Sequence, residues 1–455
     1  MINRIQTRLR AAFTLVEMLI AMALTLILVY AIAEFYAYIG TAVRDGRAAI
    51  EMSSQVRAVA QQLNTDLQSL TLRPEPWIDA AASPGYFTVY EGPYNDSYPD
   101  GTTNLITDSD NNTVPDVVQD GNITNLVGDG DDVLAFTIRA GSTPFQAQVW
   151  DGSQNVVVNS QYAEVIWFTA FTDLDGDDVW DINEPRFLCR RQFVILPSLG
   201  TLPMRSNLAD FVKEAEVSFR VNNSGQPVAN SLADLSLRHC RFGCQAANGN
   251  PSYPSPLYFN PVNAASVTTY TLQNNKFGED RLLSNLLAFD VRVYDPNAPI
   301  YRDSSSNNTA VTPGDFGFAA AVGNANLIGY GAWVDLSYNR GLSTAASSYF
   351  SGPPASPFNL SAPTATTQPY NFHAWDTWPT AYELSNLGYT SFPGTGRSAN
   401  GLDDDNTNGV DDAGERQTQP PYAAPLRGIQ ARIRVYEPAT RQMRQVTVGA
   451  DFVAE

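Results

Sequence analysis

The chain has 455 residues, a formal net charge of −19 and 11% aromatic residues. Only two lysines occur, Lys213 and Lys276, and a partner with a phosphate backbone needs clustered basic residues. The composition therefore excludes nucleic acid as an expected partner. The length suffices for one large or two ordinary globular domains besides any membrane segment.

A basic leader precedes the first apolar run. Residues 1–12 contain three arginines and no acidic residue, and from 13 to 32 the only charge is Glu17. About 20 apolar residues of helix cross a hydrocarbon core, so we predict a single transmembrane helix over residues 13–39. By the positive-inside rule the leader is cytoplasmic. The rest of the chain is then expected in the periplasm or outside the cell, anchored in the inner membrane.

The order of these features resembles the type IV prepilin class, which includes the pilins and the pseudopilins of type II secretion. Phe13 follows the small residue Ala12, and Glu17 stands four residues later. The resemblance implies that a prepilin peptidase removes the leader between Ala12 and Phe13 and methylates the new N-terminus. The family usually has Gly before the cut, where this chain has Ala12.

The resemblance also implies that Glu17 pairs with the N-terminal amine of a neighbouring pilin or pseudopilin subunit during fibre assembly. A lone carboxylate at membrane depth costs roughly 2.5–3.5 kcal/mol to insert and usually marks function. The alternative is a plain single-span anchor with a tolerated Glu near its cytoplasmic end.

The helix is expected to continue beyond the membrane. Apolar positions recur at steps of three and four residues, as on one face of an amphipathic helix. They are Val56, Ala60, Leu63, Leu67 and Leu70. We predict that residues 40–73 prolong the helix, pack this stripe on a globular domain and end at the prolines 74 and 76. Gly40 and Gly46 mark positions where the helix could bend.

Residues 74–296 are predicted to form a β-rich globular region of short β-branched and aromatic runs. The predicted strands are Val133–Ile138, Tyr162–Phe171, Phe187–Leu196 and Glu214–Val221.

Two later runs, Phe289–Pro296 and Ala431–Pro438, repeat each other and alternate apolar with charged residues. Each is predicted to be a strand with one buried and one wet face. The repeat indicates either two related half-domains or two strands of one sheet.

Residues 297–425 are rich in Ser, Pro, Gly, Asn and Tyr, which indicates a loop-rich insertion. Within it, Tyr330–Tyr338 can add a strand, and the aromatic residues of Tyr370–Trp378 indicate partial packing. Residues 426–455 are predicted to form a C-terminal β-hairpin. The fold class is therefore α+β, a long N-terminal transmembrane helix packed on a β-rich antiparallel domain.

This architecture resembles the J-type minor pseudopilins of type II secretion or the W-type minor pilins. The resemblance implies a subunit of a type II secretion pseudopilus or a type IV pilus, at or near its tip. The alternative function is a pilin-anchored surface adhesin or binding protein that uses the insertion as its contact surface.

Two acidic loops have the ligand spacing of a calcium site, with oxygen side chains at positions 1, 3, 5, 9 and 12 and a backbone carbonyl at position 7. The first set is Asp173, Asp175, Asp177, Val179, Asp181 and Glu184. The second set is Asp404, Asn406, Asn408, Val410, Asp412 and Glu415. The flanks of the first loop are predicted strands, so it resembles the loops of thrombospondin type 3 repeats more than an EF-hand. The alternative for each is a surface turn that binds no metal.

The three cysteines allow one disulfide with a thiol left over. Cys240 with Cys244, or Cys189 with either, are equally open pairings, and an envelope location permits them.

Catalysis is not expected. The two histidines, His239 and His373, are the only neutral-pH bases, and neither lies in a known catalytic motif. The enzymatic alternative is a glycan-active enzyme in which Trp375 and Trp378 stack sugars.

Overall fold

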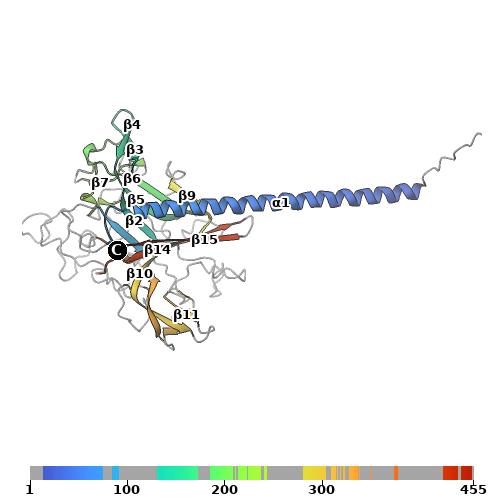
Figure 1. Cartoon of the computed structure of the whole chain (residues 1–455). Helices are drawn as coiled ribbons and strands as arrows, with labels where there is room; N and C mark the ends of the chain where they lie inside the picture. The colour runs from blue at the N-terminus through green and yellow to red at the C-terminus, as the bar shows by residue number, and fades with distance from the viewer. Residues whose placement is uncertain are drawn as a thin grey trace, which may run out of the picture. The chain divides into compact units, whose positions relative to one another are not determined.

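The computed structural model of the chain begins with one long helix, α1, Leu15–Gln68 (Figure 1). Its 54 residues correspond to about 81 Å at 1.5 Å per residue. Gly40 and Gly46 lie inside α1 without interrupting it.

The helix ends before the prolines that were expected to stop it. After Gln68 the chain pairs with strand β2, Val133–Arg139, where the amide of Thr71 donates to the carbonyl of Thr137 at 3.0 Å. Leu70 forms an isolated bridge with Ile138. Strand pairing therefore ends the helix.

The chain divides into two compact units, residues 1–54 with 437–442 and residues 55–436 with 443–455. Some residues between these limits are not described. The structure describes residues 14–74, 85–91, 130, 132–172, 185–206, 208, 211, 214–222, 224–236, 240–242, 280–303, 309–313, 315, 318, 321–322, 327–336, 338, 350, 373–377, 424–438 and 442–452.

A six-stranded antiparallel sheet organises the larger unit, with strand order β13-β1-β2-β5-β6-β9. Besides β2, its strands are β13 (His373–Asp376), β1 (Phe87–Glu91), β5 (Tyr162–Phe171), β6 (Arg186–Val194) and β9 (Arg281–Ser284). Strands β2, β5 and β6 confirm three predicted strands within two residues at either end. The fourth prediction, Glu214–Val221, is wrong at its start, because only Phe219–Val221 forms a strand, β7.

The central strands are buried on both faces, which explains their near-continuous apolar runs. On β5, Ile166 and Phe168 belong to a buried cluster with Phe193 and Val217. The alternate residue Trp167 instead donates from Nε1 to Asp66 of α1 at 3.0 Å. Residues from the last turns of α1 therefore face one side of this sheet and the apolar cluster occupies the other.

The predicted apolar stripe of α1 is confirmed at Val56, Leu63 and Leu67, which are all buried. Asp66 does not belong to the predicted stripe, yet it is 2% exposed and accepts from Arg190 Nε of β6 at 2.7 Å. The packed face of the helix therefore includes a charged residue.

A second sheet has the order β11-β10-β14-β15, with β12 paired to β10. Its strands are β10 (Leu286–Asp303), β11 (Thr309–Val311), β12 (Leu327–Val334), β14 (Gly428–Glu437) and β15 (Gln442–Asp451). The two repeated runs lie in β10 and β14, which pair antiparallel with Phe289 opposite Ile433. They are therefore neighbouring strands of one sheet. The adjacent β14 and β15 confirm the C-terminal hairpin.

The wet face predicted for β10 is wrong. Asp290 and Arg292 are 3% and 1% exposed. Arg292 Nε lies 3.0 Å from Asp290 and 3.3 Å from Asp335, so buried pairing replaces solvation. On β14 the predicted alternation of buried and partly exposed residues is observed.

The insertion supplies strands to both sheets. Strand β10 runs through the boundary predicted between residues 296 and 297, and β12 confirms the strand expected near Tyr330. Strand β13 pairs with β1 and places Trp375 in the core. Two further strand pairs complete the described part, β3 (Phe145–Trp150) with β4 (Asn155–Ser160) and β7 with β8 (Pro227–Ala229).

Candidate assembly site

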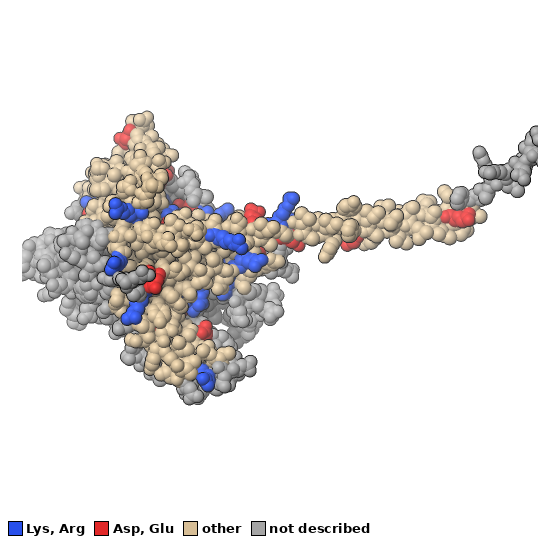
Figure 2. All heavy atoms as spheres, viewed as in Figure 1, with Lys and Arg blue, Asp and Glu red and all other residues tan. Residues whose placement is uncertain are grey.

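The N-terminal part of α1 is apolar on every side. One described helix, α1, is long and apolar enough to cross a membrane, and none of its most apolar window is buried. Leu15, Leu24 and Tyr30 are each more than 60% exposed. Figure 2 shows this part of the helix as an almost continuous tan surface with few charged side chains. A helix that is apolar all round requires an apolar surrounding.

Glu17 lies in the first turn of this helix and forms a capping box with Thr14. The Thr14 amide donates to Glu17 Oε2 at 2.8 Å, and the Thr14 hydroxyl donates to the same oxygen at 3.0 Å. The Glu17 amide lies 3.2 Å from the Thr14 hydroxyl oxygen and donates to it. The spacing Thr-x-x-Glu gives this reciprocal pattern, which satisfies amides that helix geometry leaves unpaired.

Both Thr14 donors reach the same oxygen of Glu17. Among the described residues, no donor reaches Oε1. A carboxylate offers about four lone-pair sites, so a further donor can be accommodated. Ala12 and Phe13, the predicted cleavage and methylation positions, lie outside the described residues.

The sequence comparison agrees with this geometry. Residues 7–32 match the prokaryotic N-terminal methylation motif. This motif is characteristic of type IV prepilin-like proteins, and a membrane-anchored pilin fits the single apolar helix that carries it. Neither the search of curated proteins nor that of solved structures found a match.

All predicted calcium ligands lie outside the described residues. In the described part of the chain, no group of three or more His, Cys, Asp or Glu side chains could hold a metal. The ends of the first loop are nevertheless described. The amide of Thr172 donates to the carbonyl of Pro185 at 3.0 Å, which closes the loop at its base between β5 and β6.

The described cysteines narrow the disulfide alternatives. Cys189 and Cys240 are both buried and are not bridged to each other. Burial raises the pKa of both thiols, so the reactive thiolate is disfavoured at neutral pH. Cys244 lies outside the described residues.

The aromatic residue proposed to stack sugars is not accessible. Trp375 is completely buried, and its Nε1 donates to the carbonyl of Ala424 at 2.8 Å. Trp378 and His239 lie outside the described residues, and His373 is placed only by its backbone pairing with Glu91. The prepilin-type motif favours a structural subunit over an enzyme.

Sequence reasoning missed a buried polar network on one side of the six-stranded sheet. Glu164 of β5 accepts from the Tyr86 hydroxyl at 2.7 Å, the Ser218 hydroxyl at 2.6 Å and the Phe242 amide at 3.0 Å. Burial raises the pKa of Glu164, while these hydrogen bonds and the nearby Arg241 oppose the rise.

Arg241 extends this network to the insertion. Its guanidinium pairs with Asp376 of β13 and lies 4.1 Å from the ring centroid of Tyr86. It also donates from Nε to the carbonyl of Leu235 at 2.8 Å. Breaking a buried pair of this kind leaves an uncompensated charge, so the network holds β13 in the sheet. Because 135 residues separate Arg241 from Asp376, no local sequence pattern signals the pair.

Proposed function

We propose that the chain is a minor pilin or pseudopilin, processed by a prepilin peptidase and incorporated at or near the tip of a type II secretion pseudopilus or a type IV pilus. In this proposal the leader is cytoplasmic, the apolar part of α1 crosses the inner membrane, and the β-rich unit is periplasmic or extracellular. The observation that carries the proposal is the capped Glu17 at the start of an exposed apolar helix that matches the methylation motif. The tip position rests on the resemblance to J-type and W-type subunits.

The capping box suits a carboxylate that acquires a second partner during assembly. Cleavage before Phe13 keeps the peptide bond between Phe13 and Thr14, so both Thr14 donors to Glu17 survive processing. The Oε1 atom can then accept from the methylated amine of a neighbouring subunit. Such a pair joins opposite charges in a low-dielectric surrounding, where the attraction is far stronger than in water.

The test is Glu17→Ala in cells that assemble the fibre. We expect the variant to insert in the membrane at the normal level but to disappear from sheared fibres, because the neighbour's amine loses its partner. Glu34→Ala is the matched control, since it removes the other exposed acid of the same helix region. Normal incorporation of Glu17→Ala would refute the assembly role.

Processing is tested separately by the mass of the mature N-terminus. We expect a chain that begins at methylated Phe13, and we expect Ala12→Gly to be cleaved at least as fast. A mature chain that retains residues 1–12 would contradict the proposal at its first step.

We further propose that the two acidic loops bind calcium in a structural role. The hydrogen bond between Thr172 and Pro185 supports this, because it joins the two ends of the sequence segment that contains the first ligand set. Extracellular calcium modules bind with dissociation constants of about 10⁻⁴ to 10⁻³ M. Calorimetry of the full chain in detergent with calcium should release heat, and Asp173→Ala combined with Asp404→Ala should remove it. Absence of heat in the unmodified chain would reduce both loops to surface turns.

The alternative function, surface attachment through the insertion, is favoured by one observation. Strand β12 exposes Leu327, Ile328 and Tyr330, and the last is 62% exposed. Replacing all three by Ser should abolish attachment of the fibre to surfaces and spare fibre formation. If attachment is unchanged, this part of the insertion is not the contact surface.

A further inference from the structure

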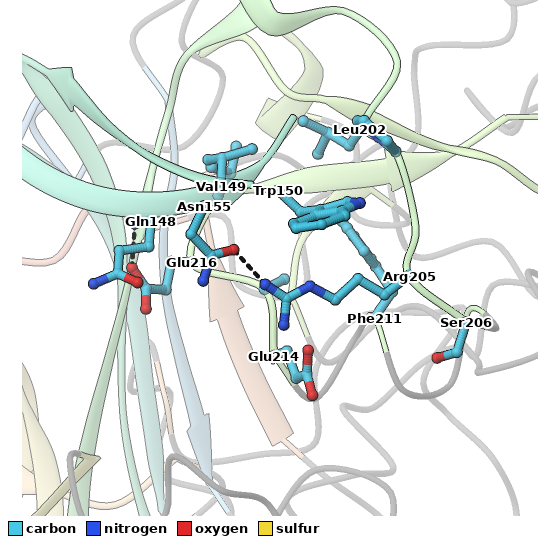
Figure 3. Close-up of a pocket in the computed structure, with 13 residues that line it drawn as sticks. Gln148, Val149, Trp150, Asn155, Leu202, Arg205, Ser206, Phe211, Glu214 and Glu216 are labelled. Carbon is cyan, nitrogen blue, oxygen red and sulfur yellow. Dashed lines mark hydrogen bonds between the residues drawn. The ribbon is translucent and has the colours of Figure 1, made fainter. Parts of the chain in front are cut away.

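A small pocket lies between the β3–β4 hairpin and the segment 202–217 in the larger unit (Figure 3). Its volume is about 250 Å³. The walls combine two aromatic residues, Trp150 and Phe211, with several polar side chains. This is the composition of a binding site, in which apolar surface supplies contact and a few polar groups orient the ligand.

The hairpin turn fixes the position of Trp150. Residues 151–154 connect β3 to β4, and Asp151 Oδ1 accepts from the amides of Ser153 and Gln154 at 2.8 and 2.9 Å. Gly152 adopts a φ of 103°, which favours glycine. Trp150 and Asn155 are consequently opposite each other at the end of the ladder. An internally bonded turn thus presents an indole and an amide side by side.

Arg205 holds both side chains in place from the facing segment. Its guanidinium lies 4.6 Å from the centroid of the Trp150 ring and donates to the Asn155 side-chain oxygen. Figure 3 shows the Arg205 and Asn155 side chains meeting beside the indole. Stacking and hydrogen bonding together restrict the rotamers of all three residues.

The remaining polar groups carry both signs of charge. Glu214 and Glu216 line the pocket together with Arg205. The Gln148 amide of the backbone donates to Glu216, and the Gln148 side chain is exposed at the pocket. Because two carboxylates stand with one guanidinium, the lining carries a net negative charge and disfavours an anionic ligand. A cationic ligand would have to approach the Arg205 guanidinium that lies over Trp150.

We propose that this pocket binds one unit of a neutral carbohydrate. Planar amide and carboxylate groups match the donor and acceptor pattern of sugar hydroxyls. Arg205 covers one face of the half-buried Trp150, so the apolar surface for the C–H face of a sugar ring is the remainder of the indole together with Phe211. The volume admits a single ring, so a terminal sugar or one residue of a chain fits.

The proposal is tested by saturation-transfer NMR on the full chain in a non-glycosidic detergent. The probes are the methyl glycosides of glucose, galactose, mannose and N-acetylglucosamine. At least one should receive saturation at its ring protons. Gln148→Ala should weaken that binding by about threefold to tenfold, as expected for the loss of one neutral hydrogen bond.

Gln146→Ala is the matched control. Gln146 stands two residues earlier on the same face of β3 but does not line the pocket. Unchanged binding in Gln146→Ala, with weaker binding in Gln148→Ala, supports the site without a substitution of the packed residue Trp150. Equal effects of the two Gln variants, or no saturation transfer to any glycoside, would overturn it. L-arginine amide serves as a cationic probe, and binding of that probe in place of the sugars would also overturn it.

Discussion

The two parts of helix α1 have the same backbone geometry but differ in which of their side chains are buried. Residues 15–43 are exposed and apolar on all sides, whereas the turns from Val56 to Leu67 bury a narrow stripe. Each part also contains an acid that accepts hydrogen bonds, Glu17 near the beginning and Asp66 near the end. The surroundings of each acid, rather than its residue type, decide whether it stays exposed or packs against the six-stranded sheet.

Hydrogen-bond partners separate the two acids. Glu17 is bonded by Thr14 of its own helix turn, so its satisfaction is independent of the rest of the chain. Asp66 is bonded by Trp167 and Arg190 from two strands of the six-stranded sheet. We therefore expect removal of Asp66 to disturb the fold and removal of Glu17 to leave it intact.

The largest effect is expected for Asp66→Ala. It leaves the Trp167 N–H without its acceptor and the Arg190 guanidinium without its carboxylate, with Gln192 as the neutral acceptor that remains. Loss of one partner of a buried pair costs about 4 kcal/mol. Chemical denaturation of the full chain, followed by the fluorescence of buried tryptophans, measures the loss. Glu17→Ala is the control and should leave the same transition unchanged. A loss below about 1 kcal/mol in Asp66→Ala would show that the pair is solvated.

A somewhat smaller effect is expected for Leu63→Ala. Leu63 is fully buried, and a cavity left by truncation of such a leucine costs about 3 kcal/mol. Leu24→Ala removes the same atoms from the exposed part of the helix, where Leu24 is 61% exposed. The Leu24 variant should leave the unfolding of the β-rich unit unchanged. Similar losses of unfolding free energy in both variants would show that the two parts of the helix contribute equally to the fold.

These contrasts show which features are predictable from sequence. The apolar stripe of α1 follows from local periodicity, and strands such as Tyr162–Phe171 follow from runs of β-branched and aromatic residues. The structure confirms both. The buried state of Asp66, Glu164 and Asp290 is not predictable in this way. The partners of Asp66 and Glu164 come from distant parts of the chain, as with Asp66 and Arg190 at a separation of 124 residues. Asp290 pairs with Arg292 of its own strand, but Arg292 also reaches Asp335 of a distant segment. A charged residue in an alternating pattern therefore indicates a wet face only when no distant partner covers it.

The Thr14–Glu17 motif, in contrast to these buried acids, can be recognised from the sequence alone. Its spacing is local, and the structure adds only that Thr14 is the intramolecular partner of Glu17. The pocket beside Trp150 was missed because it needs a hairpin and a segment about 50 residues later. The two meet where Arg205 donates to Asn155 and where the Gln148 amide donates to Glu216.

The buried Glu164 extends the comparison of acids to the pH dependence of folding stability. Like Glu17 it accepts both an N–H and an O–H donor, but it is buried in the core. Its pKa in the folded chain is raised by burial above the unfolded value, so the folded form binds the proton more tightly. Its contribution to stability is then greatest below the unfolded pKa and is lost as pH rises through the folded pKa.

The prediction is a difference in slope. The unfolding free energy of the wild-type chain, compared with that of Glu164→Gln, should fall more steeply with rising pH in the window above the ordinary glutamate pKa. The absolute stability of the variant should also drop, because the new amide faces donors from Ser218 and Phe242. Parallel pH profiles for the two proteins would show that Glu164 keeps one charge state throughout.

The smallest effect concerns the two glycines near the middle of α1. A Cβ at Gly40 or Gly46 would meet nothing within 4 Å, and both glycines lie in unbroken helix. Gly40→Ala and Gly46→Ala should each stabilise the helix by about 1 kcal/mol and slow amide exchange around these residues roughly fivefold. Unchanged exchange would mean that neither glycine limits the stability of the helix against local opening. If the stiffer variants are instead less well incorporated into fibres, the glycines serve a bend that assembly requires, because a substitution that only strengthens a straight helix cannot impair a straight subunit.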